Sequence, residues 1–172
     1  MMIGVIALGV LTSPMAASAC GCGSWTGPVA ASGTSSGGVS WKAMAVRHGP
    51  GNFSIEFRYS WNGEEQSDYG FGTGGFPNRS YPLVSGVPGS GIGPEGESDI
   101  AGVVSWRTKE LVIVMKSGKR IRFKPVAAPL KLRQRWPWIK ALRFYDQFFD
   151  GSERAVRLLA LNAAGDVIAR QN

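Results

Sequence analysis

Two cysteines, Cys20 and Cys22, are the only thiols of this 172-residue chain and its first candidates for chemistry. Their C-x-C spacing differs from the C-x-x-C of redox sites, and no helical pattern follows that would lower a thiol pKa. A structural zinc site needs four ligands, and His48 is the only histidine. No cysteine follows Cys22, so no disulfide within the chain can crosslink the residues after it. The pair predicts neither a metal site nor a redox site.

The residues before Cys20 are typical of an export leader, which we expect as a signal peptide or membrane anchor over residues 1–19. These residues carry no charge, residues 3–11 form an apolar run, and residues 17–19 read Ala-Ser-Ala, which fits the A-x-A rule of signal peptidases. Cys20 stands where bacterial lipoproteins carry a diacylglyceryl group, so lipidation at Cys20 is the favoured prediction. Secretion after cleavage and an uncleaved anchor stay open as alternatives, although the apolar run is shorter than a membrane span.

The acidic residues and the histidine form no catalytic constellation in the sequence. Glu95, Glu97 and Asp99 alternate and have oxygen ligands for Ca²⁺, but the rest of a calcium loop is missing and we expect a solvated acidic loop. The stretch GIGPEG has the letters of a dinucleotide loop, yet its proline lacks an N–H and its glutamate would repel phosphate. His48 would be the only base for a Ser-His-Asp triad, and no G-x-S-x-G elbow is present. We therefore expect a protein that is not an enzyme, with no catalytic residues, no cofactor and no metal, while a carboxylate pair would depend on the fold.

A basic stretch from Lys116 to Arg143 holds ten Lys and Arg residues and no acidic one, in a chain of net charge +7. Its segment RQRWPWIK mixes tryptophan with cations, which suits either the interface of an anionic membrane or a polyanionic wall polymer. Export disfavours nucleic acid as a partner, and a protein partner and the oligomeric state stay open. The alternative is that the tryptophans fill the core and the cations form a solvated face. The candidate residues for anionic-surface binding are Lys119, Arg120, Arg122, Lys124, Lys131, Arg133, Arg135, Trp136, Trp138 and Lys140.

Alternation of apolar and polar residues predicts strands as the elements that position these groups. Residues 53–61 alternate as a half-buried strand, and residues 140–149 are apolar and aromatic. Residues 110–126 predict a hairpin with the turn KSGK, whose first strand is central and whose second is buried on one face. Residues 155–170 predict another hairpin. Seven to nine such strands predict an all-β, antiparallel, immunoglobulin-like sandwich, with a small β-barrel as the alternative.

The composition divides the chain into three parts. After the leader, the Gly, Ser, Thr and Ala content of residues 20–38 indicates a flexible tether. The β-sandwich domain is then expected over residues 39–172. Residues 76–98, rich in Gly and Pro, are expected to be a loop.

Four segments of the C-terminal half support a resemblance. These are AGVVS, the hairpin around SGKRIRF, the strand LRFYDQFF and the closing LALNAAGDVIAR, in that order between Asp99 and Asn172. Together they resemble uncharacterised bacterial secreted or lipoprotein domains that end in an A-x-D-x-x-G-x-x-L-like strand pair, with Asn162 in place of the Asp and Ile168 in place of the Leu. The resemblance implies an immunoglobulin-like β-sandwich in the cell envelope, and it implies no chemistry.

The leader, the tether and the missing catalytic constellation lead to one functional expectation. We expect a non-enzymatic, exported, lipid-anchored binding or accessory module of the cell envelope, in contact with anionic lipid or wall polymer. A membrane-tethered extracytoplasmic sensor or partner domain is the first alternative. A small hydrolase that uses carboxylates is the second.

Overall fold

Antiparallel strands account for most of the protein, in a computed structural model that describes residues 27–49, 52–73, 83–85, 89–90 and 97–172. Within these ranges, residues 46–49, 52–53, 66–73, 83–85 and 89–90 are described by their backbone alone. The expected leader and the lipidation site Cys20 lie outside the described residues. Among the residues described, no helix is long and apolar enough to cross a membrane.

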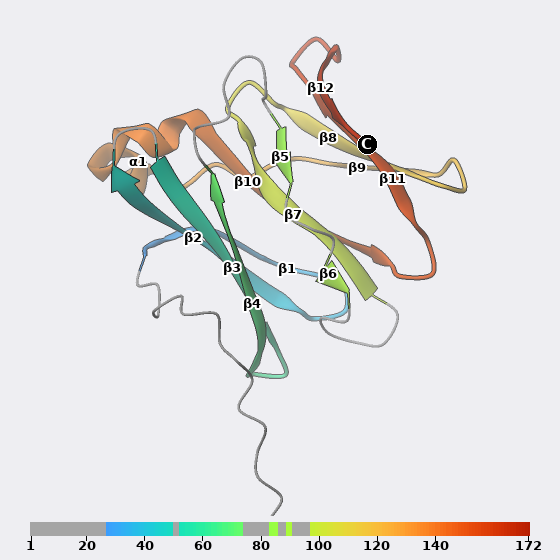
Figure 1. Cartoon of the computed structure of the whole chain (residues 1–172), viewed down its shortest axis with the longest axis horizontal. Coiled ribbons are helices and arrows are strands. Elements are labelled where there is room, and N and C mark those ends of the chain that lie inside the picture. Colours follow the sequence, from blue (N-terminus) through green and yellow to red (C-terminus); the bar gives the residue numbers. More distant parts are fainter. Residues whose placement is uncertain (1–26, 50–51, 74–82, 86–88, 91–96) are drawn as a thin grey trace, which may run out of the picture.

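Twelve strands within the described ranges form three antiparallel sheets (Figure 1). The first sheet has the order β1 (Val29–Thr34), β2 (Ser40–Gly49), β3 (Asn52–Trp61) and β4 (Glu64–Thr73). The middle sheet has the order β10 (Leu142–Asp150), β7 (Glu97–Ser105) and β5 (Leu83–Ser85), and β6 (Gly89–Ser90) also pairs with β7. The third sheet has the order β12 (Val167–Gln171), β11 (Ala155–Leu161), β8 (Glu110–Met115) and β9 (Arg120–Phe123).

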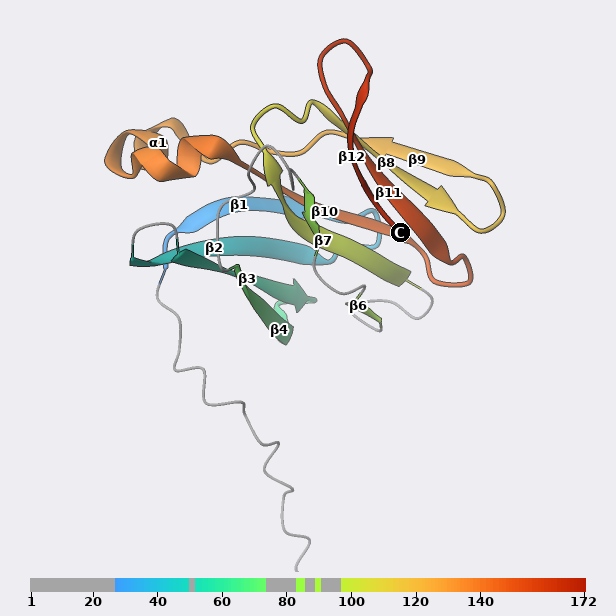
Figure 2. The same ribbon diagram turned by 45° about the horizontal axis from the view of Figure 1, so that its top comes forward.

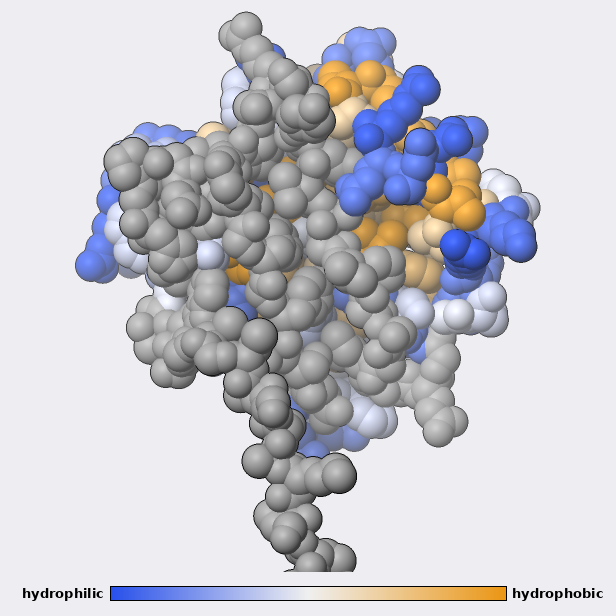
Figure 3. All heavy atoms as spheres, in the orientation of Figure 1, coloured by the Kyte–Doolittle hydropathy of each residue, from blue (hydrophilic) through white to orange (hydrophobic). Residues whose placement is uncertain are grey.

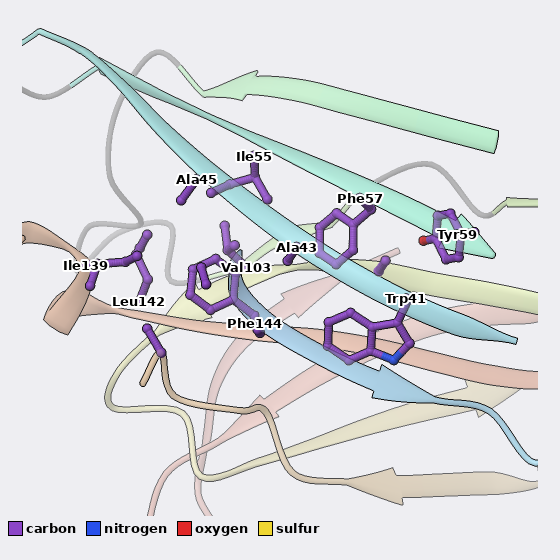
Figure 4. Packing of buried hydrophobic residues seen from close by; sticks show 14 of the residues in the cluster. Trp41, Ala43, Ala45, Ile55, Phe57, Tyr59, Val103, Ile139, Leu142 and Phe144 are labelled. Carbon is purple, nitrogen blue, oxygen red and sulfur yellow. The ribbon is translucent and has the colours of Figure 1, made fainter. Parts of the chain in front are cut away.

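The middle sheet lies between the other two, as Figure 2 shows. On β10, Phe144 and Phe148 pack with residues of the first sheet, whereas Tyr145 and Phe149 pack with residues of the third sheet. Because side chains alternate between the faces of a strand, aromatic residues at neighbouring positions of β10 can contribute to two cores at once. The first core, with Trp41, Phe57 and Phe144 among its members, is shown in Figure 4.

The main sequence-based predictions of architecture are confirmed. The fold is all-β and antiparallel with packed sheets. The two predicted hairpins are β8–β9 and β11–β12, and their turns use Gly118 and Gly165 at φ +87° and +86°. β8 is interior to its sheet, as its apolar sequence predicts, since it pairs with both β11 and β9.

The tether expected over residues 20–38 is wrong for Val29–Thr34, which forms β1 and pairs with β2. Ala30 and Ala31 are buried in the first core. At Gly33 of the same strand there is no room for a side chain, because a Cβ there would approach Trp41 Nε1 to 2.6 Å. The domain therefore begins before residue 39.

Strand β3 is more buried than its alternation predicts. Ser54 and Glu56, expected on a polar face, are 5% and 4% exposed. A buried carboxylate requires a partner, and Glu56 forms an ion pair with Arg58 on the same face. The stretch expected to be a loop over residues 76–98 also contains the short strands β5 and β6.

Two short helices precede β10, where the sequence shows no helical period. These are α1 (Leu130–Arg135) and the 3₁₀ helix η1 (Pro137–Ala141). Six residues are too few to establish a period of 3.6. Ile139 is fully buried and fixes η1 to the first core, so the helices hold the residues around them in place.

Candidate functional site

The candidate residues for anionic-surface binding separate into two groups in the fold. Lys119, Arg120, Arg122 and Lys124 lie in or next to the β8–β9 hairpin. The other six lie on α1, on η1 or, in the case of Trp136, between the two helices. The turn of the β8–β9 hairpin and helix α1 lie at opposite ends of the molecule in both ribbon views (Figures 1 and 2). The residues of the basic stretch therefore do not form one patch.

The hairpin group is partly neutralised by acidic residues of neighbouring segments. Lys119 Nζ lies 2.9 Å from Glu153 Oε1, and this hydrogen bond raises the pKa of Lys119. Arg122 Nη1 lies 2.7 Å from Glu110 Oε2 on the adjacent strand β8. Exposed pairs of this kind contribute little stability, but they cancel two of the positive charges of the hairpin.

The helical group keeps its charge. Lys131 and Arg135 on α1 and Lys140 on η1 are exposed, and the described residues form no ion pair with them. Neither helix contains an acidic residue. In the part of the chain that the structure describes, these cations thus face solvent without an acidic partner.

The two tryptophans of the helical group have different environments. Trp138 packs against the first core, as the core-filling alternative expects. Trp136 is half-buried, and the guanidinium of Arg135 lies 5.7 Å from its ring centroid, in the range of a cation–π contact. Leu130, at the start of α1, is 61% exposed. Apolar and cationic side chains therefore share this surface.

The β7–β8 connection brings two residues to this surface that the basic stretch does not contain. The Trp106 N–H donates to the carbonyl of Ala141 at 2.9 Å, which joins the loop to η1. Trp106 is 48% exposed, with the guanidinium of Arg107 5.7 Å from its ring centroid. In RQRWPWIK an arginine and a tryptophan are also adjacent, but in the order Arg-Trp. The sequence around Trp106 and Arg107 therefore gives little indication that these two residues belong to the same surface. We call the following set the cationic end: Trp106, Arg107, Leu130, Lys131, Arg133, Arg135, Trp136, Lys140 and Arg143.

A buried acidic cluster lies between the first and middle sheets. Asp99 of β7 is 1% exposed, and the hydroxyl of Tyr59 donates to its Oδ2 at 3.1 Å. Asp146 of β10 points toward the same face, and both its carboxyl oxygens are buried without a hydrogen-bond partner. The expectation that Asp99 belongs to a solvated acidic loop is wrong, because β7 begins at Glu97 and carries Asp99 into the interior.

Burial, and then the negative charge of Asp99, raise the pKa of Asp146 to about 8, while the nearby Tyr59 hydroxyl acts in the opposite direction. Asp146 therefore holds a proton at neutral pH, and the pair carries one charge rather than two. Two carboxyls with one proton are suited to general acid–base chemistry. Here both lie between packed sheets, which disfavours contact with a substrate. Within the described ranges, no three His, Cys, Asp or Glu residues are grouped so as to hold a metal ion.

The third sheet also exposes apolar side chains, which Figure 3 shows at the upper right. Val156 of β11 and Val167 of β12 are 42% and 40% exposed. The cationic end combines exposed apolar groups with cations from three segments of the chain, and these cations form no ion pair among the described residues.

No protein-family model, curated protein or solved structure matches this chain. The resemblance to bacterial secreted and lipoprotein domains therefore stays a prediction.

Proposed function

We propose that this protein is a non-enzymatic binding module of the cell envelope, and that its cationic end contacts an anionic surface. The observation that carries the proposal is a set of six cations at the same end as exposed Trp106 and Leu130, none of which forms an ion pair with a described residue. These cations are Arg107, Lys131, Arg133, Arg135, Lys140 and Arg143. Cations attract anionic headgroups while indole and aliphatic groups enter the interface.

The proposal favours lipid over a wall polymer as the anionic surface. Binding of a polyanion in water depends on cations and gains little free energy from an exposed leucine. A membrane interface, in contrast, binds both cationic and apolar side chains. Leu130 and Lys131 are neighbours at the start of α1, and Trp106 lies beside η1 through its bond to Ala141. Apolar and cationic groups at one end are the combination that a phospholipid surface would bind.

The proposed location is the outer side of a membrane, with a lipid on Cys20 as the anchor. Mass spectrometry of the mature N-terminus from native membranes tests this part. A diacylglyceryl mass on Cys20 supports it. An unmodified Cys20 at the N-terminus indicates secretion, and an intact leader indicates an uncleaved anchor; either result contradicts the lipid anchor but leaves the surface contact standing.

Cosedimentation of the full chain with vesicles tests the surface contact itself. A Cys20→Ser variant removes the acyl group, so that only the folded domain can bind. We expect this variant to sediment with vesicles containing phosphatidylglycerol and not with neutral phosphatidylcholine vesicles. Binding should decline steeply between about 0.05 and 0.5 M salt, because salt screens exposed charges. Equal binding to both vesicle types, or binding to neither, would overturn the proposal.

The two alternative functions make different predictions. A sensor or partner domain would keep its activity after the cationic end is neutralised, because its contacts would lie on other surfaces. A carboxylate hydrolase would use Asp99 and Asp146, and it would lose its activity in Asp146→Asn. The burial of that pair supports the binding module over the hydrolase.

A further inference from the structure

The third sheet is an outer layer of the molecule, so one of its faces packs on the middle sheet and the other faces outward (Figure 2). On β8 and β11, the residues Leu111, Ile113 and Leu158 belong to the core between these two sheets. Because side chains alternate along a strand, Val112 and Val114 of β8 point outward. The strand register then identifies the residues that share this outward face.

Cross-strand neighbours form two rows on the outward face. One row consists of Arg170, Leu159, Val112 and Arg122, which lie on β12, β11, β8 and β9 in that order. The next row consists of Arg157 on β11, Val114 on β8 and Arg120 on β9. Side chains that are directly opposite on one face are close enough to act together. We call these seven residues the arginine face.

A β-bulge brings Arg157 to the arginine face. The register between β11 and β8 shifts between Ala155 and Arg157, and Ala155 packs against the core on the other side of the sheet. Without the extra residue, Arg157 would point the same way as Ala155, toward that core. Bulges redirect side chains in this way, and this one gives the face arginines on three of its four strands.

Three of the four arginines have no acidic partner among the described residues. Arg120 and Arg170 form no ion pair with them, and Nε of Arg157 donates to the neutral Oδ1 of Asn172 at 3.1 Å. All three arginines are exposed. The arginine face therefore attracts negatively charged groups.

Glu110 indicates which kind of anionic partner fits this face. It lies on the outward side of β8, two residues before Val112, and its Oε2 is 2.7 Å from Nη1 of Arg122. The pair shows that a carboxylate can form a charge-assisted hydrogen bond with an arginine of this face. A uniform polyanion or an anionic membrane would be repelled by Glu110, whereas a protein surface can place its charges to match.

The apolar residues between the arginines also favour a protein partner. Val114 and Leu159 are half-buried and Val112 is 2% exposed, so they form a shallow floor between the arginines. They are less able to enter a membrane than the exposed Leu130 of the cationic end. Arginine is enriched and lysine is depleted in protein interfaces, and every cation of the two rows is an arginine.

We propose that the arginine face docks a partner protein, through a surface on which carboxylates flank apolar side chains. This contact is separate from the proposed lipid contact, because α1 lies at the end of the molecule remote from the third sheet in both ribbon views (Figures 1 and 2). A chain held on a membrane by its cationic end would leave the arginine face accessible. Four strands about 4.8 Å apart span about 14 Å, so the contact is small and the complex is expected to be weak.

A synthetic peptide with the sequence Glu-Ser-Leu-Ser-Glu-Ser-Leu-Ser-Glu is the probe. Alternate residues of an extended peptide share one side, so its glutamates and leucines lie together. A second peptide has serine in place of both leucines and the same charge. Nuclear magnetic resonance of the full chain follows the Nε–Hε signals of Arg120 and Arg170. We expect the first peptide to shift both signals and the second to bind about fivefold more weakly. Absence of a shift with the first peptide would overturn the proposal.

A pair of double variants tests whether the contact is local. Arg120→Gln with Arg170→Gln removes one charge from each side of the arginine face, and binding of the first peptide should weaken about fivefold. The control, Lys131→Gln with Lys140→Gln, removes the same charge from the cationic end. Its peptide affinity should stay within about twofold of wild type. An equal loss in the two variants would show that net charge alone attracts the peptide, and would contradict docking at the arginine face.

Val114→Thr tests the apolar floor with a residue of nearly the same shape. Binding of the first peptide should weaken about twofold, and binding of the peptide without leucine should not change. An unchanged affinity for the first peptide would show that the face binds charge alone, which would overturn docking of an apolar and acidic surface.

Phosphatidylglycerol vesicles distinguish a protein partner from a lipid. The Arg120→Gln and Arg170→Gln double variant should bind these vesicles as the wild type does, because the proposed lipid contact lies on the cationic end. A specific loss of vesicle affinity in this variant would show that the arginine face contacts lipid, and would overturn the protein partner. Failure of the wild type itself to bind vesicles would reject the proposed lipid contact and leave the peptide result standing.

Discussion

Asp146 and Asp99 lie diagonally across the β7–β10 pair, on the face of the middle sheet that the first sheet covers. In the strand register Asp146 is opposite Ala101, two residues from Asp99, and Asp99 is opposite Phe148. Diagonal neighbours on one face are close enough for their charges to interact, and the charge of Asp99 contributes to the raised pKa of Asp146. The interior therefore contains a carboxyl, that of Asp146, whose pKa of about 8 lies near neutral pH.

The first prediction is a loss of stability as the pH rises. In the folded chain the pKa of Asp146 is about 8, against 3.8 for an ordinary Asp. Between these values the folded state binds more protons than the unfolded state, so the free energy of unfolding should fall as the pH rises, by up to about 1.4 kcal/mol per pH unit. Urea unfolding at pH 5, 6.5 and 8 measures this slope.

Asp146→Asn is the control for this slope, because an amide does not titrate. The difference in stability between variant and wild type should increase from pH 5 to pH 8 in favour of the variant. Asp150 and Glu153 have lowered pKa values. Their contributions to the free energy of unfolding are therefore lost only in solutions more acidic than this pH range. A difference that is constant over this range would show that Asp146 is ionised throughout.

The second prediction concerns the hydroxyl of Tyr59. Tyr59→Phe removes the donor to Asp99 Oδ2 and leaves the ring in its core position. We expect a loss of about 1.5–3 kcal/mol, the contribution of a hydrogen bond to a charged group. The same substitution in an Asp99→Asn background should cost less, since the buried charge is gone. An equal cost in both backgrounds, measured by urea unfolding, would mean that the hydroxyl does not act through Asp99.

The third prediction tests whether β1 is part of the folded domain. In Gly33→Ala the new Cβ would lie 2.6 Å from Trp41 Nε1, and Trp41 is buried in the first core. Overpacking of this kind should cost about 1–3 kcal/mol. The matched control is Ser32→Ala, an exposed position on the same strand, which should change stability little. If chemical unfolding gives the same stability for both variants, the segment behaves as a tether after all.

Strand positions could be predicted where the alternation was strong. The β8–β9 and β11–β12 hairpins combine apolar strand sequences with a glycine at a turn that needs positive φ, and both features are local. β1 was not predicted because its buried side chains are alanines, and a linker of small residues has the same composition. Helix α1 escaped because a six-residue element has no measurable period.

The candidate site could be predicted only in part, because tertiary contacts assemble it. The composition of the basic stretch identifies Lys131, Arg135 and Lys140, but Arg107 joins them through the Trp106–Ala141 hydrogen bond. Neutralisation of Lys119 and Arg122 depends on acidic residues of other strands. The Asp99–Asp146 pair depends on strand register, which no single segment of sequence contains.

The most direct test of the proposed function compares the two ends of the molecule. In the Cys20→Ser background, Lys131, Arg135 and Lys140 are replaced by glutamine in one variant. The matched control replaces Lys116, Arg120 and Lys124, three exposed cations of the β8–β9 hairpin that form no ion pair with any residue the structure describes. Both variants lose three positive charges, so they differ only in which end is neutralised.

Affinity for phosphatidylglycerol vesicles is the measured quantity. Each basic residue near an anionic membrane contributes about 1 kcal/mol, so neutralising the cationic end should weaken binding roughly a hundredfold. The hairpin control should remain within about threefold of the unmodified background. An equal loss of affinity in the two variants would show that net charge alone draws the protein to the membrane, and would contradict a binding surface at the cationic end.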